Sequence, residues 1–450
     1  MTSASTAPSV VPETAVVIGA GIAGLAAART LSDRFAEVVV LDRDELPDLA
    51  TPRRGVPQGA HGHILLGSGQ EALGELFPGL VAELVAAGAI PFDPGAELSY
   101  HRYGIIWPLV STGVGLLAFS RPLLETALYR RVRDLPNVRV RDRTAVAGLV
   151  SADRRVTGVR LADGAVIAAA LVVDSTGRGS RSDRWLADLG CPAPRVVEIK
   201  IGLGYASRLL RRRPGDFGPQ VGAFALPAPP HEKRAGLVLA VEDDRWLVSL
   251  GGWHGEFPGA DEESFLAHAR SLPHPAIAEI LGRCEPLTEI ATHHFPSSRR
   301  RYFEEQTDAP AGYLALGDAI CSFNPIYGQG MTCAALQSIA LGRLLDQHGT
   351  PGAALSRDFY QEAGRIIATP WKFAAGGDFA YPETVGRRPR GIRLLNRYSR
   401  RIQLAAQVDP EIRRTFTQVQ HLLLPPSVLR RPAMVWKVLR TSRRAPGARA

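Results

Sequence analysis

The segment from Val16 to Leu31, VVIGAGIAGLAAARTL, joins a β-branched apolar run to a glycine-rich turn and then to an alanine-rich amphipathic stretch. Its glycines, Gly19, Gly21 and Gly24, follow the order G-x-G-x-x-G. The first permits a tight turn, the second lets the backbone approach a pyrophosphate, and the third lets the helix lie close to the sheet. This order of strand, turn and helix predicts a βαβ dinucleotide site with phosphate at the helix N-terminus. An ordinary glycine-rich crossover is the alternative.

An acidic residue follows the next apolar run of the chain. Residues Val38 to Leu41 predict a second strand, and Asp42 and Arg43 come directly after it. In dinucleotide-binding folds, a carboxylate about 20 residues beyond the glycine turn accepts hydrogen bonds from the adenosine ribose. We therefore expect Asp42, with Arg43 beside it, at the adenosine end of the site.

A second candidate cofactor segment runs from Gly312 to Leu345, GYLALGDAICSFNPIYGQGMTCAALQSIALGRLL, and predicts a strand followed by a long amphipathic helix. The turn between them contains a carboxylate and several turn-forming residues, namely Gly317, Asp318, Pro325, Gly328 and Gly330. The carboxylate suits ribityl or ribose hydroxyls, and free N–H groups at a helix start suit the negative charge of a reduced isoalloxazine ring. This combination favours a flavin over a nicotinamide as the bound cofactor.

The composition is that of a globular chain. Its 450 residues are 45% hydrophobic and 22% charged, which suits a large core in about two or three domains. No apolar stretch reaches the roughly 18 residues of a membrane-spanning helix, and residues 1–13 lack the pattern of a signal peptide. We expect a cytoplasmic protein without a transmembrane segment. The cysteines show no C-x-x-C spacing, so we expect them to be reduced and mostly structural: Cys191, Cys284, Cys321 and Cys333.

Positive charge is concentrated near the C-terminus. Residues 386–450 contain 16 of the 53 Lys and Arg residues and 2 of the 44 Asp and Glu residues, so their net charge is +14. The net charge of the whole chain is +9. The remainder of the chain carries −5, so no nucleic-acid partner is expected. The basic region is explained either by a solvated helical surface or by a docking face for an acidic partner or an anionic membrane surface.

Periodic patterns organise the rest of the chain. Apolar and polar residues alternate in VEIKIGL, and GLVLAVEDDRWLVSLGGW predicts a hairpin around Asp243 and Asp244. Residues 138–177 predict a small antiparallel meander, and residues 69–88 and 116–133 predict helices. We therefore expect an α/β fold with a Rossmann-like cofactor domain, an antiparallel substrate sheet and a basic helical region. The expected boundaries are 14–190 and 310–346 for the cofactor domain, 191–309 for the substrate domain and 347–450 for the helical region.

The glycine motif paired with GDAICSFNPIYGQGM resembles the FAD-dependent aromatic-hydroxylase-type (class A) monooxygenases, which include squalene epoxidase-like enzymes. The segments RRGVPQGAHGHILLGSG and TPWKFAAGGDFAYPETVG resemble a bacterial subgroup of polyether epoxidases. The similarity extends from Ala15 to about Gly386. It implies an FAD domain of the glutathione-reductase type and a C4a-hydroperoxyflavin, formed with O2, that delivers one oxygen atom. The implied reaction is epoxidation or hydroxylation of an apolar polyketide or isoprenoid-like intermediate of natural-product biosynthesis.

The resemblance also implies roles for individual residues. Gly19, Gly21 and Gly24 would hold the pyrophosphate, and Asp42 the adenosine ribose. Further cofactor contacts are implied at Arg54 in the Arg53–Gly59 loop near the ring, Arg121 at the phosphate or ribityl region, Asp318 at the ribityl hydroxyls or phosphate, and the Pro325–Gly330 loop along the ring.

Flavin-borne chemistry needs no catalytic triad, so no catalytic residue is assigned. The protein must instead keep water out of a pocket above the ring, and the candidate walls are Phe224, Trp253 and Phe323, although plain core packing explains each of them better. His61 and His63 have no third ligand at a suitable spacing, so no metal is expected. We expect both to hydrogen-bond the loop beside the flavin.

One motif departs from the family pattern. The D-G-x-x-S-x-x-R motif, which serves FAD and NADPH together, falls on TGRGSRSD, where Thr176 replaces the acid and Asp183 stands in place of arginine. The electron source is therefore either NAD(P)H without its own domain or a separate flavin reductase. Alternative functions are a geranylgeranyl reductase-like flavoenzyme, a flavin-dependent halogenase, which the absence of W-x-W-x-I-P weakens, and a non-enzymatic flavin-holding protein.

Overall fold

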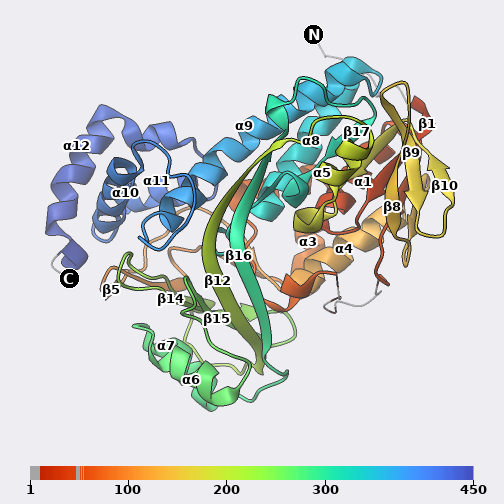
Figure 1. Ribbon diagram of the computed structural model, residues 1–450. Coiled ribbons are helices and arrows are strands. Elements are labelled where there is room, and N and C mark those ends of the chain that lie inside the picture. Colours follow the sequence, from red (N-terminus) through yellow and green to blue (C-terminus); the bar gives the residue numbers. More distant parts are fainter. Residues whose placement is uncertain (1–10, 47–50, 52, 54, 449–450) are drawn as a thin grey trace, which may run out of the picture.

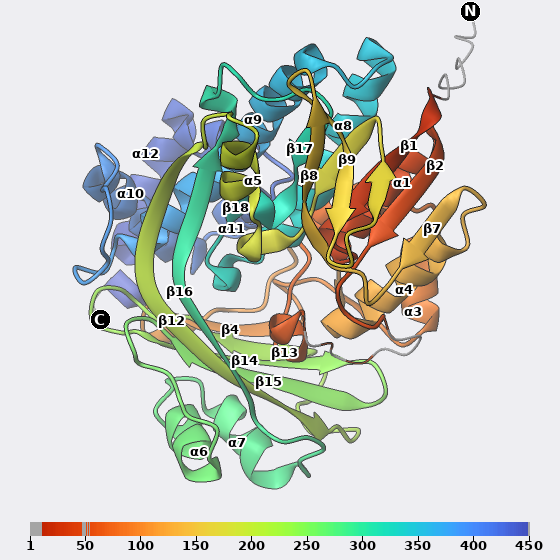
Figure 2. The same ribbon diagram turned by 45° about the vertical axis from the view of Figure 1, so that its right-hand side comes forward.

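The computed structural model describes residues 11–46, 51, 53 and 55–448. A parallel five-stranded sheet with strand order β17-β11-β1-β2-β7 forms one layer of the molecule (Figure 1 and Figure 2). Its strands are β1 (Val11–Ile18), β2 (Phe35–Leu41), β7 (Val138–Arg141), β11 (Leu171–Asp174) and β17 (Tyr313–Ala315). The central strands are almost wholly buried, which explains their uninterrupted apolar runs. This sheet is the Rossmann-like layer that the glycine motif predicts.

Helices α1 (Ile22–Ser32) and α8 (Gly330–His348) pack against each other beside the parallel sheet. The hydroxyl of Thr30 on α1 donates to the backbone carbonyl of Ser338 on α8 at 3.1 Å. Each of these helices follows one of the two glycine-rich turns. Their contact therefore brings together two motifs that lie some 300 residues apart in the sequence.

A second, eight-stranded sheet has the order β18-β16-β12-β15-β14-β13-β4-β5. Its strands are β4 (Leu98–Arg102), β5 (Ile105–Ile106), β12 (Arg195–Arg211), β13 (Gly222–Ala225), β14 (Arg234–Val241), β15 (Arg245–Gly252), β16 (Ala291–Tyr302) and β18 (Cys321–Ser322). Figure 2 shows that β12 and β16 are long and curved and run from the parallel-sheet layer to the far end of the second sheet, where α6 (Glu262–Arg270) and α7 (Pro275–Arg283) lie. Strands β4 and β5 of the second sheet lie within residues 14–190, which we expected to belong to the cofactor domain.

The predicted hairpin is confirmed as β14 and β15, which pair antiparallel. Asp243 and Asp244 form its turn with φ of 59° and 50°. Aspartate tolerates this left-handed conformation better than most residues, and two such residues in a row match the twist of a hairpin.

The predicted meander is only partly right. β8 (Val146–Ala152), β9 (Arg155–Leu161) and β10 (Val166–Ala168) form a separate antiparallel sheet, but β7 and β11 at its two ends join the parallel sheet. Strand β11 is buried on both faces, as a strand within a parallel layer must be. Periodicity alone could not tell this apolar run from the next strand of a meander.

Both predicted helical segments are interrupted. Residues 69–88 fall on two helices, α2 (Gly67–Leu76) and α3 (Leu80–Ala86), because Pro78 and Gly79, with φ of 83°, break the run. Residues 116–133 begin with β6 (Leu116–Ala118), which pairs with β3 (Ile90–Phe92), and only then enter α4 (Arg121–Arg133). The Ser120 hydroxyl caps α4 by accepting from the Leu123 N–H at 3.4 Å.

The C-terminal region is helical, as predicted, and forms the blue part of Figure 1. It contains α9 (Ala353–Asp378), α10 (Ile392–Ala406), α11 (Pro410–Gln420) and α12 (Pro432–Thr441). Ile412 and Phe416 on α11 pack with Trp107, which follows β5, in one buried cluster. The C-terminal helices therefore cover the β4–β5 edge of the second sheet. No helix in the described part of the chain is long and apolar enough to cross a membrane.

Candidate functional site

The glycine turn after β1 has the geometry of a phosphate cradle. Gly19 has φ of 98°, and a Cβ there would lie 2.7 Å from the Ser175 carbonyl oxygen. A Cβ on Gly24 would lie 1.8 Å from the Gly19 carbonyl oxygen, so only glycine fits. A Cβ on Gly21, in contrast, would meet only the Arg53 guanidinium at 3.8 Å. Gly19 and Gly24 therefore serve packing, and Gly21 faces the open side of the turn.

Asp42 binds the glycine turn itself. Its carboxylate accepts from the Ala20 N–H at 2.7 Å and lies 3.2 Å from an Arg53 Nη1, which donates to it. Arg53 also donates to the Ala20 carbonyl oxygen at 2.9 Å, and a small cavity of about 20 Å³ adjoins these two residues. The contact of Asp42 with ribose stays a prediction. Arg43 is exposed, and Arg54 lies outside the described residues.

The second turn lies against the first. A Cβ on Gly317, which has φ of 66°, would stand 2.9 Å from the Cβ of Ala23, two residues beyond Gly21. A Cβ on Gly330, the first residue of α8, would stand 3.2 Å from Oδ1 of Asp318. The two glycine-rich turns, which the sequence predicts to hold one cofactor, therefore converge on a single location. We call Gly21, Asp42, Asp318 and Gly330 the cofactor site.

Charge around Asp318 is balanced by two arginines. Burial raises the pKa of Asp318 to about 6, and the nearby guanidinium groups of Arg121 and Arg178 oppose that rise. Arg121, at the start of α4, also donates to Nε2 of His63 at 3.1 Å. A carboxylate flanked by guanidinium groups provides both acceptors for ribityl hydroxyls and positive charge for a diphosphate.

Unsatisfied polar atoms at this location fit a bound dinucleotide. Ser175 Oγ and Gln329 Oε1 are buried, and neither has a hydrogen-bond partner within the described residues. Ser175 adjoins Gly19, and Gln329 directly precedes α8. Buried polar groups are normally satisfied. The residues present therefore fit a dinucleotide such as FAD.

His61 and His63 do not form the expected hydrogen bonds to the loop beside the flavin within the described residues; Nδ1 of His61 instead pairs with the Ser207 hydroxyl at 2.8 Å. Nδ1 of His63 donates to the His61 carbonyl oxygen at 2.9 Å, so its Nε2 accepts from Arg121. Burial, assisted by Arg121, lowers the pKa of His63 to about 3, and burial lowers that of His61 to about 3. Both rings are therefore neutral at physiological pH.

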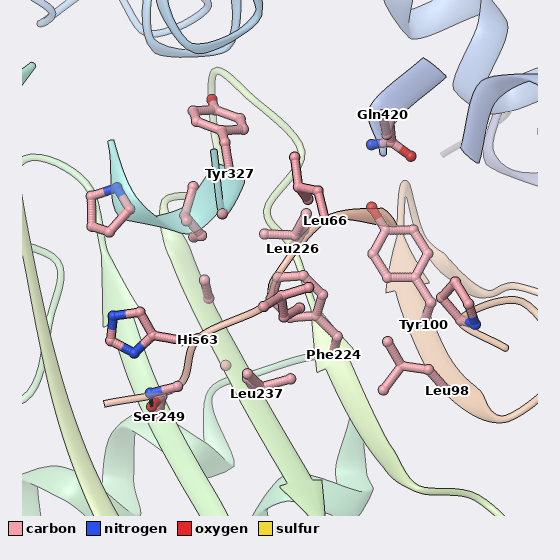
Figure 3. A pocket seen from close by; sticks show the side chains of 18 of the residues that line it. His63, Leu66, Leu98, Tyr100, Phe224, Leu226, Leu237, Ser249, Tyr327 and Gln420 are labelled. Carbon is pink, nitrogen blue, oxygen red and sulfur yellow. Dashed lines mark hydrogen bonds between the residues drawn. The ribbon is translucent and has the colours of Figure 1, made fainter. Parts of the chain in front are cut away.

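A cavity of about 270 Å³ adjoins the cofactor site (Figure 3). The loop from Pro325 to Gln329 forms one wall, and β4, β13 and β14 contribute others. Phe224 lines the cavity as predicted, but Trp253 and Phe323 are not among its lining residues. Trp253 is 3% exposed and donates to Asp378, and Phe323 is 5% exposed within the core. Of the three aromatic candidates, the structure places only Phe224 in the cavity wall.

Sequence reasoning missed the far end of this cavity. Strand β4 contributes Tyr100 and Arg102, and α11 contributes Arg413, Thr417 and Gln420. The two-residue spacing on β4 and the three- and four-residue spacings on α11 each place their residues on one face. These spacings were visible in the sequence, but nothing in it indicated that the two elements meet.

A buried acid, Asp174, lies two residues before the TGRGSRSD segment. Asp174 is fully buried and accepts from five donors, which are the N–H and Oγ1 of Thr176, the hydroxyls of Ser180 and Ser182, and the hydroxyl of Tyr313. That Thr176 stands in place of the motif's acid stays a prediction. Asp183 pairs with Arg299 and Arg301 at 2.9 and 3.0 Å.

Asp378, the last residue of α9, holds the Pro325–Gln329 loop in place through hydrogen bonds. Its Oδ1 accepts from Nδ2 of Asn324 at 2.8 Å and from Nε1 of Trp253 at 3.1 Å. The Asn324 Oδ1 in turn accepts from the Ile326 N–H at 3.1 Å. Burial raises the pKa of Asp378 to about 7, although these hydrogen bonds oppose the rise.

Replacing Asp378 with asparagine should flatten the pH dependence of stability. Between its ordinary pKa of 3.8 and about 7, the folded chain holds a proton on Asp378 that the unfolded chain has lost. Stability therefore falls as pH rises through this window, by on the order of 3–4 kcal/mol. Denaturant unfolding from pH 4 to 8 measures this fall, which Asp378→Asn should remove and Asp358→Asn, on the same helix, should keep. An unchanged fall in Asp378→Asn contradicts the assignment.

The sequence of this chain matches a family model and a related protein. A model of the NAD(P)-binding Rossmann-like domain matches residues 17–71. Protein Rv3254 from Mycobacterium tuberculosis (strain ATCC 25618 / H37Rv) is 34% identical over 440 residues, which span 92% of this chain and 91% of that protein. The chain belongs to the family of Protein Rv3254.

Solved structures share the fold of this Rv3254 family member. PqsL from Pseudomonas aeruginosa, described as a probable FAD-dependent monooxygenase, matches with a TM-score of 0.60 and 17% identity, covering 82% of this chain and 98% of PqsL. The flavin-dependent brominase Bmp2 matches with a TM-score of 0.65 and 14% identity, covering 96% of this chain and all (100%) of Bmp2. The chain therefore has the mixed α/β fold of FAD-dependent monooxygenases, extended by a helical C-terminal region.

Proposed function

We propose that this chain is an FAD-dependent monooxygenase that inserts one oxygen atom into an apolar substrate held in the cavity. One observation carries the proposal. The Gly19 and Asp318 turns meet at one cofactor site, and the loop that continues from Asp318, Pro325 to Gln329, forms a wall of the cavity. A cofactor held at the two turns would thus adjoin the space available to a substrate. The fold shared with PqsL supports a flavin as that cofactor.

The residues of the cofactor site have separate tasks in this proposal. The Gly19–Gly24 turn would bind the diphosphate, Asp318 the ribityl hydroxyls, and the Pro325–Gln329 loop the ring. Once bound and reduced, FAD supplies the chemistry that activates O2 for transfer of one oxygen atom. Asp378 and Asn324 hold the loop in place.

The cavity walls serve water exclusion and substrate selection. Leu66, Phe224 and Leu237 supply apolar surface, and the neutral rings of His61 and His63 add no charge. Excluding water protects a reactive oxygen donor from unproductive breakdown. We propose epoxidation or hydroxylation of a polyketide or isoprenoid-like intermediate, in keeping with the resemblance to polyether epoxidases.

Halogenation is the second candidate, because the likeness to the brominase Bmp2 extends over the C-terminal helices as well. The test supplies FAD-loaded protein with isotopically labelled O2, bromide and a panel of terpene alkenes and polyketide arenes. Reduction is by NADPH alone or by a separate flavin reductase, which also identifies the electron source. Labelled oxygen in a product supports the proposal. A brominated product, or a saturated product formed without O2 uptake, overturns it.

Replacing Asp318 with alanine should weaken FAD binding by about 10- to 100-fold, because bonds from hydroxyls to an ionised carboxylate are lost. Quenching of flavin fluorescence during titration of the apoprotein measures the dissociation constant. Asp308→Ala removes an exposed carboxylate ten residues earlier and should leave FAD affinity unchanged. Full FAD affinity in Asp318→Ala would place the ribityl chain elsewhere.

A further inference from the structure

Two arginines supply all the formal charge that the described residues bring to the cavity wall. Among the described residues that line the cavity, only Arg102 and Arg413 are permanently charged. The lining histidines are neutral, because burial lowers the pKa of His61 and His63 to about 3 and that of His421 to about 4. An otherwise uncharged cavity therefore carries a charge of +2.

Neither arginine has a carboxylate partner in the part of the chain that the structure describes. Arg413 is 4% exposed and donates only to backbone carbonyls, those of Pro108 and of Gly95 at 3.5 Å. Arg102 Nε is buried without a hydrogen-bond partner within the same part of the chain. Buried charges in proteins are normally paired, so these two guanidinium groups lack an anion.

The carboxylate that acts on Arg413 already has other hydrogen-bond partners. Asp93 contributes to the electrostatic field at Arg413 but forms no ion pair with it among the described residues. Its oxygens accept instead from the Ser111 hydroxyl at 2.8 Å, the Thr112 hydroxyl at 2.7 Å and the Gly95 N–H at 2.8 Å. It therefore does not neutralise the cavity.

Both arginines lie at the same end of the cavity, beside Tyr100. Burial raises the pKa of Tyr100, and the charges of Arg102 and Arg413 both oppose the rise, so both guanidinium groups lie near its hydroxyl. Figure 3 shows Tyr100 and Gln420 on one side of the cavity and His63 and Tyr327 on the other. Tyr100, with Arg413 near its hydroxyl, thus lies on the side of the cavity away from His63, and Arg102 lies within electrostatic range of both Tyr100 and Tyr327.

We propose that the substrate is an amphipathic acid whose carboxylate is bound by Arg102 and Arg413 and whose apolar body extends past Phe224 toward the Pro325–Gln329 loop. Guanidinium groups bind carboxylates through paired N–H donors, and Tyr100 and Gln420 add further donors. The carboxylate end would fix the register of the substrate, so that a carbon atom a set distance away meets the oxidising centre. Oxygen transfer to the bound acid rests on the proposed function, whereas binding of its carboxylate by the two arginines does not.

The test measures binding of naphthylacetate, its methyl ester and naphthylethylammonium to FAD-loaded protein by calorimetry. We expect the acid to bind about 10- to 100-fold more tightly than the ester, because a hydrogen-bonded charge pair is lost in the ester. Arg102→Gln should abolish this preference, Arg413→Lys should retain part of it, and Arg414→Gln, at an exposed position of the same helix, should retain all of it.

Equal affinity for acid and ester in the wild-type protein overturns the inference. So does an Arg102→Gln variant that weakens the acid and the ester equally, because that result indicates a structural role only. Thermal melting identifies any variant that fails to fold. If Arg102→Gln fails to fold, the preference of Arg413→Lys for the acid over the ester tests the inference instead. Oxygenation of neutral substrates without a preference for acids refutes this inference alone. A preference for acids without any oxygenation refutes the proposed function alone.

Discussion

Gly24→Ala is expected to abolish FAD loading. The added Cβ would lie 1.8 Å from the Gly19 carbonyl oxygen and 2.9 Å from the Gly19 carbonyl carbon. Both neighbours are backbone atoms, so relief requires α1 to move away from β1 and the phosphate turn to open. Overpacking of this kind typically costs about 1–3 kcal/mol and more where backbone must shift. The flavin absorbance of protein purified with excess FAD reports the loss.

Gly74→Ala is the matched control for this prediction. Gly74 is also a helical glycine, within α2, but nothing lies within 4 Å of its Cβ position. Alanine there should leave FAD content unchanged and raise stability by up to about 1 kcal/mol through helix propensity. Full FAD occupancy in Gly24→Ala would show that the turn is not the phosphate cradle.

Asp174→Ala is expected to lower the free energy of unfolding by on the order of 3–5 kcal/mol. The substitution leaves five donors without their acceptor, and three of them are the buried hydroxyls of Ser180, Ser182 and Tyr313. It also frees the loop at Gly177, where a Cβ would lie 3.9 Å from the Cβ of Asp318. FAD affinity should therefore fall together with stability.

Urea unfolding of the apoprotein measures the stability change without a contribution from bound FAD. Asp188→Ala on the neighbouring helix α5 (Ser182–Asp188) is the control, because its partner Arg184 lies 3.9 Å away at an exposed position. That substitution should change stability by less than about 0.5 kcal/mol. A similarly small effect of Asp174→Ala would contradict a structural role for the buried carboxylate.

The cofactor turns could be predicted because their chemistry is local in the sequence. Gly19, Gly21 and Gly24 lie within one turn, and Gly317 and Asp318 directly follow a strand, so the backbone requirement and the residue types coincide. The parallel sheet and the hairpin at Asp243 follow from equally local patterns. Their convergence in space was an inference from two motifs, and the structure now shows it.

The remaining features depend on contacts between distant segments. Tyr313 donates to Asp174 across 139 residues of sequence, and no local pattern shows that this acid accepts several buried hydrogen bonds. Likewise, the spacing of Arg413 and Gln420 predicts one helix face but not that this face meets β4. Aromatic residues are equally suited to a core and to a pocket wall, which is why Trp253 and Phe323 lie in the core and Phe224 lines the cavity.

The most direct test of the account compares the affinities of the apoprotein for FAD, ADP and FMN. If the Gly19 and Asp318 turns bind opposite halves of one molecule, FAD should bind at least about 100-fold more tightly than either half, since binding one half raises the effective concentration of the other. Both ADP and FMN should then displace FAD in competition. FAD binding no tighter than ADP, with FMN unable to compete, would contradict the account.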